Sequence, residues 1–302
     1  MRYRKIGMIG LGAMGSGMAS CLLKEGYEVC AFDIDAQAGA KIREIGAVTV
    51  SSCREVGEQS EVVVTVLPNE KVVEAATFGE NGLAVGMKPG QILIECSTIN
   101  VRSAQDIARR LGQSSIVMLD APVSGGPEGA AAGTLSFMVG GDEKAFEACT
   151  GLFSCMGREI VYMGVSGTGQ LTKLVNQLLY DINAAALAEV LPFGIKLGLE
   201  PEKIARIVNS GAGRSFASEY FMKDYLAGDF THGYNMGSAY KDLVNAADLS
   251  YRHNIPMPVT TAACVTYQQA LAKGYGCESK ASMIKIFEEI NGVRFRSASK
   301  PA

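Results

Sequence analysis

The chain has 302 residues, of which 48% are hydrophobic and 20% charged, a composition typical of a globular protein long enough for two domains. Its formal net charge of -3 excludes the strongly basic surface that nucleic acid or anionic lipid would require. We expect a cytoplasmic protein that does not span a membrane, because the N-terminal region lacks a signal-peptide pattern and no 18-residue apolar run is free of polar breaks. The eight cysteines form no CxxC pair and the two histidines have no ligand-spaced companions, so we expect no metal site.

A glycine-rich turn follows the first predicted strand, residues 5–9, and precedes a helical pattern that runs to Gly26. The turn reads Gly10-Leu11-Gly12-Ala13-Met14-Gly15. In a dinucleotide-binding turn the first glycine permits the tight bend, the second lets the backbone approach a pyrophosphate, and the third lets helix and strand pack closely. The free N–H groups at the helix N-terminus then face the phosphates. We therefore assign all six residues to cofactor binding, in preference to a purely structural turn.

An acidic residue, Asp33, ends the second predicted strand, residues 27–32, at the usual distance beyond the glycine-rich turn. A carboxylate at this point can accept hydrogen bonds from the adenosine ribose, and it would repel the 2′-phosphate of NADP. Asp35 adds negative charge, and the next basic residue is Lys41. The sequence thus favours NAD over NADP, although an ordinary turn residue is the alternative for Asp33.

Continuous apolar runs at residues 62–67, 92–96 and 116–119 alternate with helical stretches such as residues 102–111. Such runs are typical of parallel strands buried on both faces, so we predict a doubly wound α/β sheet of the Rossmann type. Ligands bind outside the carboxyl ends of the strands in such sheets. The residues expected there, next to the cofactor's ribose and nicotinamide, are Leu67, Pro68, Ser97 and Thr98.

A small-residue segment, residues 120–133, contains Ser124, Gly125 and Gly126. Successive N–H groups and a hydroxyl aimed at one point would form a receptor for a carboxylate. A flexible loop is the alternative, which the local sequence alone slightly favours. Residues 135–141 and 160–163 are expected to complete the sheet, so the first domain should span residues 1–163.

A long apolar segment, residues 171–191, predicts a helix that is buried on nearly every side. Lys173, Asn176 and Gln177 lie on one polar arc of this helix. A buried ammonium needs a partner or a cavity. On the evidence of the polar arc alone, an ion pair with a core carboxylate explains Lys173 as well as a catalytic role does. Pro192 should bend or end the helix.

The remaining residues predict an all-helical second domain, residues 164–302, beginning with this long helix. One further helix is expected to begin at about residue 200, and others at about residues 215–226, 238–251, 259–272 and 279–290. Lys241 and Asp248 share a face of one of them, which is usually a solvated face.

Four blocks, in order and spacing, resemble the β-hydroxyacid dehydrogenase family, which includes 3-hydroxyisobutyrate dehydrogenase, tartronate semialdehyde reductase and L-threonate dehydrogenase. The blocks are the glycine-rich turn, residues 120–126, residues 167–176 and residues 241–243. The resemblance implies an NAD-dependent enzyme that transfers hydride between nicotinamide and a small 3-hydroxy acid or its semialdehyde. It implies that Lys173 is the general acid/base, that Lys241 contacts the cofactor, and that the protein is a homodimer or homotetramer. It also implies a set of substrate-binding residues: Ser124, Gly125, Gly126, Asn176 and Gln177.

The chemistry of hydride transfer agrees with this resemblance, because an alcohol oxygen needs a proton acceptor and the substrate carboxylate needs an anchor. Neither histidine lies in a glycine-rich segment, so lysine is the better candidate. Its ordinary pKa of about 10.4 must fall for it to act as a base near neutral pH. Alternatives are an L-threonate-type sugar-acid dehydrogenase, an imine reductase, and a non-enzymatic NAD-binding regulatory protein. Arg214 is either a specificity residue for a second anionic group or a surface arginine.

Overall fold

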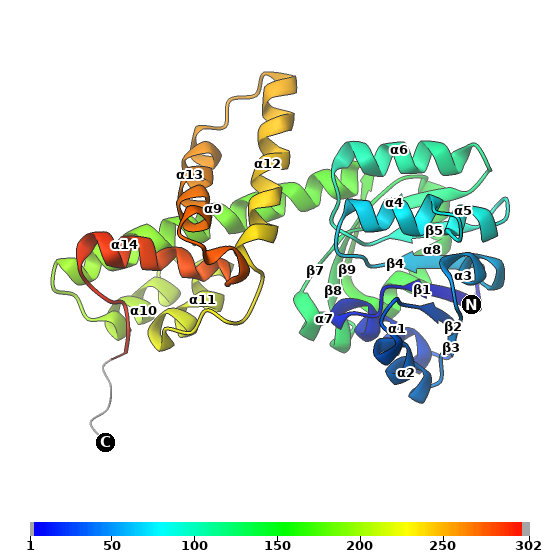
Figure 1. The fold of residues 1–302 in the computed structure, drawn as a ribbon, viewed down its shortest axis with the longest axis horizontal. Helices are drawn as coiled ribbons and strands as arrows, with labels where there is room; N and C mark the ends of the chain where they lie inside the picture. Colours follow the sequence, from blue (N-terminus) through cyan, green and yellow to red (C-terminus); the bar gives the residue numbers. More distant parts are fainter. Residues whose placement is uncertain (1–2, 298–302) are drawn as a thin grey trace. The chain divides into compact units, whose positions relative to one another are not determined.

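The computed structural model describes residues 3–297, which form two compact units, Met1–Lys173 and Leu174–Ala302 (Figure 1). The division between the units lies inside helix α9 (Thr168–Lys196), whereas the sequence predicted a boundary before this helix. The first turn of α9 belongs with the first unit because it is hydrogen bonded to strand and loop residues there.

The first unit is built on one sheet with the strand order β3-β2-β1-β4-β5-β6-β8-β7, and β9 pairs with β8. Strands β1 to β6 are parallel, β8 is antiparallel to both β6 and β7, and β9 is parallel to β8. The chain leaves β1 toward β2 on one side and returns to β4 on the other, which is the topological switch point of a doubly wound sheet. The strands are β1 (Lys5–Ile9), β2 (Glu28–Phe32), β3 (Val48–Thr49), β4 (Val62–Thr65), β5 (Ile92–Glu95), β6 (Val117–Asp120), β7 (Val123–Ser124), β8 (Leu135–Gly140) and β9 (Gly157–Gly164).

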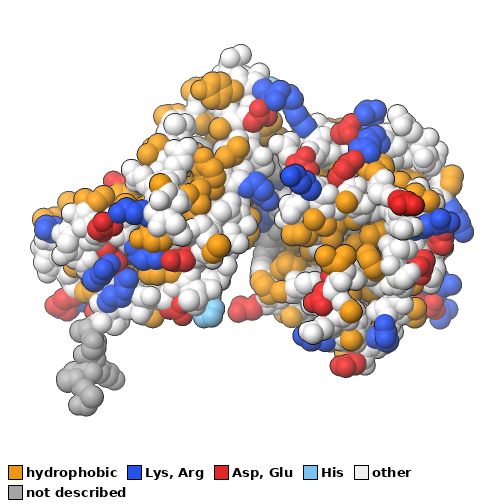
Figure 2. All heavy atoms as spheres, in the orientation of Figure 1, with side chains coloured by type: hydrophobic (Ala, Val, Ile, Leu, Met, Phe, Trp, Pro, Cys, Tyr) orange, Lys and Arg blue, Asp and Glu red, His pale blue; other side chains and the backbone are white. Residues whose placement is uncertain are grey.

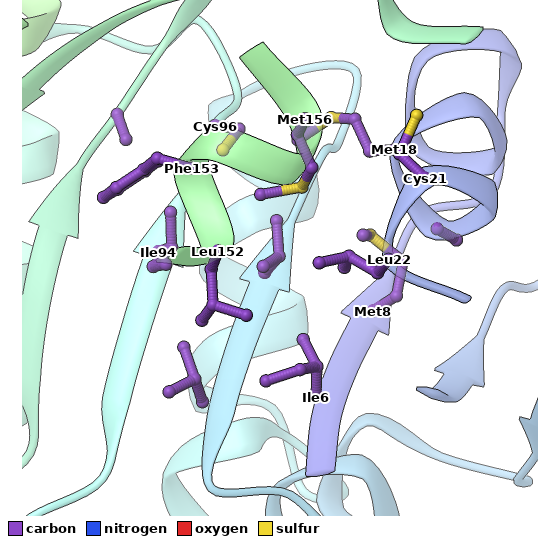
Figure 3. Packing of buried hydrophobic residues seen from close by; sticks show 14 of the residues in the cluster. Ile6, Met8, Met18, Cys21, Leu22, Ile94, Cys96, Leu152, Phe153 and Met156 are labelled. Carbon is purple, nitrogen blue, oxygen red and sulfur yellow. The ribbon is translucent and has the colours of Figure 1, made fainter. Parts of the chain in front are cut away.

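Helices cover both faces of this sheet, as the continuous apolar strands predicted. Val62 and Val64 of β4 point into one core and Val63 into the other, and all three are fully buried. Met18 and Leu22 of the first helix pack on the first face, together with residues of α8 such as Phe153 and Met156 (Figure 3). The helices are α1 (Ala13–Lys24), α2 (Ala36–Glu44), α3 (Cys53–Gln59), α4 (Glu70–Phe78), α5 (Leu83–Gly86), α6 (Val101–Gly112), α7 (Gly126–Ala132) and α8 (Glu143–Met156).

The segment of residues 124–133 contains more regular structure than the flexible loop that its sequence slightly favoured. Ser124 belongs to β7, and Gly126 begins the short helix α7. This helix ends at Ala132, and its C-cap residue Gly133 has a left-handed φ of 68°, which suits glycine. Helix α7 packs closely on α1, because a Cβ at Gly17 would lie 2.8 Å from the backbone of Ala130. Tertiary packing therefore orders a sequence that carries few local structural signals.

Helix α9 is only partly buried, so the prediction of a helix buried on nearly every side was wrong. Val175, Leu179, Val190 and Phe193 are all more than half exposed, and their spacing places them on one stripe of the helix. The helix also continues through Pro192 to Lys196, so it does not end at the proline. By length and composition α9 could cross a membrane, but this is weak evidence because a core helix passes the same test.

The second unit is helical, and its described residues contain no strand beyond one isolated bridge between Asn235 and Ser279. Its core joins one side of α9 to the other helices, with Phe221, Tyr225 and Tyr267 fully buried. The segment predicted as one helix at residues 279–290 is a 3-10 turn followed by an α-helix. The elements are α10 (Pro201–Ser210), α11 (Phe216–Ala227), α12 (Met236–His253), α13 (Pro258–Ala272), η1 (Tyr275–Cys277), η2 (Lys280–Met283) and α14 (Ile284–Asn291).

Candidate active site

The glycine-rich turn joins β1 to α1 at the switch point of the sheet. Gly12 occupies the N-cap position of α1 without a side-chain cap, and both Gly12 and Ala13 are exposed, whereas Leu11 is buried and Met14 half-buried. The first N–H groups of this helix are therefore offered to an external acceptor. This is the local geometry that a dinucleotide pyrophosphate needs.

The three glycines of the turn differ in what surrounds them. Gly10 has a φ of 88°, and a Cβ there would lie 2.1 Å from the carbonyl oxygen of Val66. A Cβ at Gly15 would lie 1.8 Å from the carbonyl oxygen of Gly10. These two glycines are required by the fold itself. A Cβ at Gly12 would meet nothing within 4 Å, so this position leaves room for a ligand.

Asp33 lies directly after β2 and is oriented by two backbone donors. The N–H of Leu11 donates to its Oδ2 at 2.5 Å, and the N–H of Asp35 donates to its Oδ1 at 2.8 Å. The carboxylate is therefore tied to the glycine-rich turn. Asp35 has a different local role, because its side chain caps the N-terminus of α2 by accepting from the N–H of Gln37.

The ends of β4 and β5 lie next to each other in the sheet, as predicted. The N–H of Leu67 donates to Oγ of Ser97 at 2.7 Å, which ties the two strand ends together. Ser97 is buried, Leu67 and Thr98 are half-buried, and Pro68 is exposed. The parallel pairing of β1, β4 and β5 places these residues on the same edge as the glycine-rich turn.

The predicted carboxylate receptor begins at the end of β7. Ser124 is half-buried and pairs with Ser136 of β8, while Gly125 and Gly126 are exposed. Both glycines have positive φ, 131° and 66°, a conformation that other residues rarely adopt. The small residues thus permit an exposed backbone turn between β7 and α7.

The helix that carries Lys173 is anchored to the sheet by a buried carboxylate. Asp120, at the end of β6, accepts from the N–H of Gly167 at 2.7 Å with Oδ1 and from the N–H of Gln170 at 3.0 Å with Oδ2. Burial raises the pKa of the Asp120 carboxyl, and these N–H donors oppose that rise. Gly169 is essential to the fit, because its Cβ would lie 2.3 Å from the carbonyl oxygen of Asp120. Lys173 follows one turn later and is 8% exposed.

The other predicted polar residues lie in the second unit. Nδ2 of Asn176 is 3.4 Å from Oε1 of Gln177, whose Nε2 is 3.4 Å from Oδ2 of Asp242 on α12. Gln177 and Asp242 are buried, Asn176 is exposed, and Lys241 is half-buried. Within this unit the hydrogen bond from Gln177 thus joins α9 to the residue of α12 that follows Lys241.

Comparison with known proteins supports the same interpretation along the whole chain. Residues 5–164 match a family model described as the NAD binding domain of 6-phosphogluconate dehydrogenase. Residues 167–287 match a second family model, described as NAD-binding of NADP-dependent 3-hydroxyisobutyrate dehydrogenase. The chain is 39% identical to 2-(hydroxymethyl)glutarate dehydrogenase of Eubacterium barkeri, with 96% of each chain covered, and 34% identical to L-threonate dehydrogenase of Cupriavidus necator, with 95% and 97% covered.

The crystal structure of 3-hydroxyisobutyrate dehydrogenase from Salmonella typhimurium is similar with a TM-score of 0.87 and 32% identity, covering 94% of this chain and all of that one. The chain belongs to the β-hydroxyacid dehydrogenase family. The family resemblance and the fold class predicted from the sequence are thereby confirmed.

Members of the β-hydroxyacid dehydrogenase family are dehydrogenases that act on CH–OH groups with a nicotinamide dinucleotide, so the prediction of such an oxidoreductase is confirmed. Because relatives of this extent and identity are enzymes, the alternative of a non-enzymatic regulatory protein loses its support. The relatives act on small hydroxy acids, as their names state.

Two residues of this β-hydroxyacid dehydrogenase escaped the sequence analysis. Asp120 begins a predicted motif, and its carboxylate anchors α9. Gln170 received no role, although it is 2% exposed and bonded at both ends of its amide. The sequence signal available was only the place of Gln170 directly before the apolar segment of residues 171–191, where a buried amide must find partners.

Arg214, which the sequence left as either a specificity residue or a surface arginine, lies at the surface of the second unit. Its guanidinium is 3.5 Å from Glu219 of α11, and both side chains are more than half exposed. Among residues 3–297 no group of three or more histidine, cysteine, aspartate and glutamate side chains could hold a metal ion.

Proposed function

We propose that this protein oxidises a small 3-hydroxy carboxylic acid, or reduces the corresponding semialdehyde, with Lys173 as general acid/base. The observation that carries the proposal is the burial of Lys173, 8% exposed, on a helix whose first turn is hydrogen bonded to the carboxyl ends of β5 and β6. A lysine held at that edge can exchange a proton with a substrate oxygen beside the dinucleotide site.

The residues present fit a dinucleotide. Gly12 leaves open space, the N-terminus of α1 is uncapped, and Asp33 is held next to both. We assign the six residues of the glycine-rich turn to the pyrophosphate and Asp33 to the adenosine ribose. By the family motif, Leu67, Pro68 and Thr98 would border the nicotinamide half, and Lys241 would contact the cofactor. Nicotinamide, when bound, accepts or supplies the hydride.

The remaining tasks fall to the protein's own side chains. Lys173 takes the proton from the substrate hydroxyl in the oxidation direction and returns it in reduction. Ser124, Gly125 and Gly126 offer a hydroxyl and backbone N–H groups to the substrate carboxylate, and we assign Asn176 and Gln177 to the same substrate. Fixing the carboxylate and the oxygen together orients the carbon–hydrogen bond that is broken.

NAD is the preferred cofactor in this proposal. The Asp33 carboxylate is already oriented by the N–H groups of Leu11 and Asp35, so it cannot easily turn away from an incoming ribose. An anionic 2′-phosphate would meet this charge, whereas the free 2′-hydroxyl of NAD can donate to it.

A substrate panel tests the reaction directly. The purified protein is mixed with NAD and, in turn, 3-hydroxyisobutyrate, 2-(hydroxymethyl)glutarate, L-threonate and D-glycerate, and formation of NADH is followed by absorbance. The proposal requires turnover of at least one acid. Turnover of the sugar acids alone would select the L-threonate-type reaction, and bound NAD with no turnover of any acid would contradict the proposal.

We also propose that the chain forms a dimer or tetramer through the apolar stripe of α9. Hydrophobic side chains reach the surface of the helical unit among charged ones (Figure 2), and on α9 Leu179 is 61% exposed and Val190 59%. Covering such a stripe with a second copy would remove it from water. Light scattering should give a multiple of 31.9 kDa for the wild-type chain. Leu179→Glu with Val190→Glu should lower that mass, whereas Tyr251→Glu, on α12, should not; an unchanged mass for the double variant would contradict the proposal.

A cytoplasmic location is a further part of this proposal. All eight cysteines are free, and five of them are buried, which fits a reducing compartment. Fractionation of cells that express the tagged protein would test it.

A further inference from the structure

Gln170 joins α9 to the loop that follows β5. Its Nε2 donates to the carbonyl oxygen of Ser97 at 2.7 Å, and its Oε1 accepts from the N–H of Ile99 at 3.1 Å. Its own N–H donates to Asp120 at 3.0 Å. The side chain is 2% exposed, so each of these polar groups is satisfied away from water.

The loop that Gln170 holds is itself tied to two strand ends. Ser97 accepts from the N–H of Leu67 with its hydroxyl, and its own N–H donates to Glu95 at 2.6 Å. Glu95 in turn accepts from the hydroxyl of Thr65 at 2.7 Å. One amide side chain therefore connects α9 to β4 and β5 through a continuous set of hydrogen bonds.

Lys173 follows Gln170 by three residues, so the two side chains project from adjacent turns of one helix. We propose that Gln170 is a positioning residue, which sets the distance between the Lys173 ammonium and the Leu67–Ser97 edge where nicotinamide would lie. This inference rests on the proposed function of Lys173. It adds a residue that touches neither substrate nor cofactor.

The physical basis is geometric. A hydrogen bond from each end of one planar amide fixes both the height and the rotation of the first turn of α9 against the loop. Loss of both bonds would leave the Ser97 carbonyl and the Ile99 N–H buried without partners, and the turn would shift to satisfy them. A displacement of about 1 Å between reacting groups can lower a rate roughly 100-fold.

The first test compares Gln170→Met with Gln105→Met. Gln105, on α6, is exposed, and its side-chain hydrogen bond goes to the carbonyl oxygen of Ser166 at 3.2 Å, next to the start of the same helix, and not to the loop after β5. We expect kcat of Gln170→Met to fall about 10- to 100-fold with the KM for substrate and the Kd for NADH within about threefold. Gln105→Met should keep kcat within about twofold.

The second test uses Gln170→Glu, whose protonated carboxyl has the same shape and the same donor and acceptor as the amide. The ionised form lacks the donor and faces the Ser97 carbonyl with a negative charge. The rate of this variant, divided by the wild-type rate at each pH, should therefore rise as the pH falls. The same ratio for Gln170→Met should stay flat, because methionine does not titrate.

Each outcome decides between the possibilities. Two results with an active wild-type enzyme would show that the positioning role is wrong while the proposed function stands. In the first, Gln170→Met keeps its kcat. In the second, the variant has a lower kcat, a higher KM and a lower stability together. If the wild-type protein has no turnover, the proposed function fails, and amide hydrogen exchange at Ile99 still reports on the hydrogen bond between Ile99 and Gln170. We expect the Ile99 amide to exchange faster in Gln170→Met. Unchanged exchange would show that Gln170 does not hold the loop after β5.

Discussion

The ammonium of Lys280 lies 2.5 Å from the Asp181 carboxylate, and neither side chain is exposed at all. Lys280 also sits 3.3 Å from the centre of the Tyr180 ring, and Tyr267 donates to Asp181 at 3.2 Å. Burial raises the pKa of the Asp181 carboxyl, which Lys280 opposes, and burial lowers the pKa of Lys280. This ion pair joins α9 to η2 inside the helical unit.

Removing one partner of this pair should destabilise the protein strongly. Lys280→Met leaves the Asp181 carboxylate buried without its ammonium, which costs about 3–5 kcal/mol, or of the order of 10 °C in Tm. The double variant Lys280→Met with Asp181→Asn removes both charges and should regain most of that loss. Thermal unfolding of the single and double variants checks this, and equal Tm values for both would contradict it.

Loss of the lysine amine should affect the rate and not the binding of the cofactor. Lys173→Met should lower kcat about 10²–10⁴-fold, because a general acid/base typically contributes that much. Fluorescence titration with NADH should give a Kd close to the wild-type value. Lys196→Met, at the far end of α9, is the matched control and should keep kcat. A loss of NADH affinity as large as the loss of rate would argue against the assignment.

The open space at Gly12 gives a clean test of cofactor binding. Gly12→Ala meets no protein atom within 4 Å, so the variant should fold with nearly the wild-type Tm. Its methyl group would occupy the space of the pyrophosphate, so the Kd for NADH should rise about tenfold or more. Gly15→Ala, whose Cβ would lie 1.8 Å from a carbonyl oxygen, should instead lose stability. Tight NADH binding by Gly12→Ala would place the dinucleotide elsewhere.

The charge of Asp33 should set the choice between NAD and NADP. Asp33→Asn keeps an acceptor for the Leu11 N–H and removes the negative charge. The ratio of kcat/KM for NAD to that for NADP should fall on the order of tenfold, because a charged hydrogen bond is worth about 1.5–3 kcal/mol. Initial rates with both cofactors measure this ratio. If the wild-type enzyme already uses both equally well, the preference is wrong.

Glu95 should make stability depend on pH. Burial raises the pKa of its carboxyl to about 6, against hydrogen bonds from Ser97 and Thr65 that lower it. The folded protein therefore holds a proton between roughly pH 4.3 and 6 that the unfolded chain releases, so stability falls as the pH rises through this window. Glu95→Gln should remove about 1.3 kcal/mol of that decline, as measured by urea unfolding at pH 5 and pH 7. A decline as steep in the variant would assign it to another group.

Much of the first unit follows from local sequence patterns. The strand at residues 5–9, the glycine-rich turn and Asp33 all lie where their spacing predicted, because each depends on neighbours within a few residues. The apolar runs at residues 62–67 and 92–96 predicted strands buried on both faces, and β4 and β5 are such strands. The structure ends them one or two residues earlier, where hydrogen bonding to the neighbouring strands stops.

Sequence alone thus determined the family, the Rossmann architecture and the residue types available for chemistry, because these depend on periodicity and short motifs. Tertiary structure decided that α9 is exposed along one stripe, that residues 126–132 form a helix, and that Asp120 and Gln170 fix the start of α9. These features depend on partners far away in the chain, such as Gln170 and Ile99, which lie 71 residues apart. No local pattern encodes such a contact, since a polar side chain looks the same in sequence whether water or a distant backbone group satisfies it.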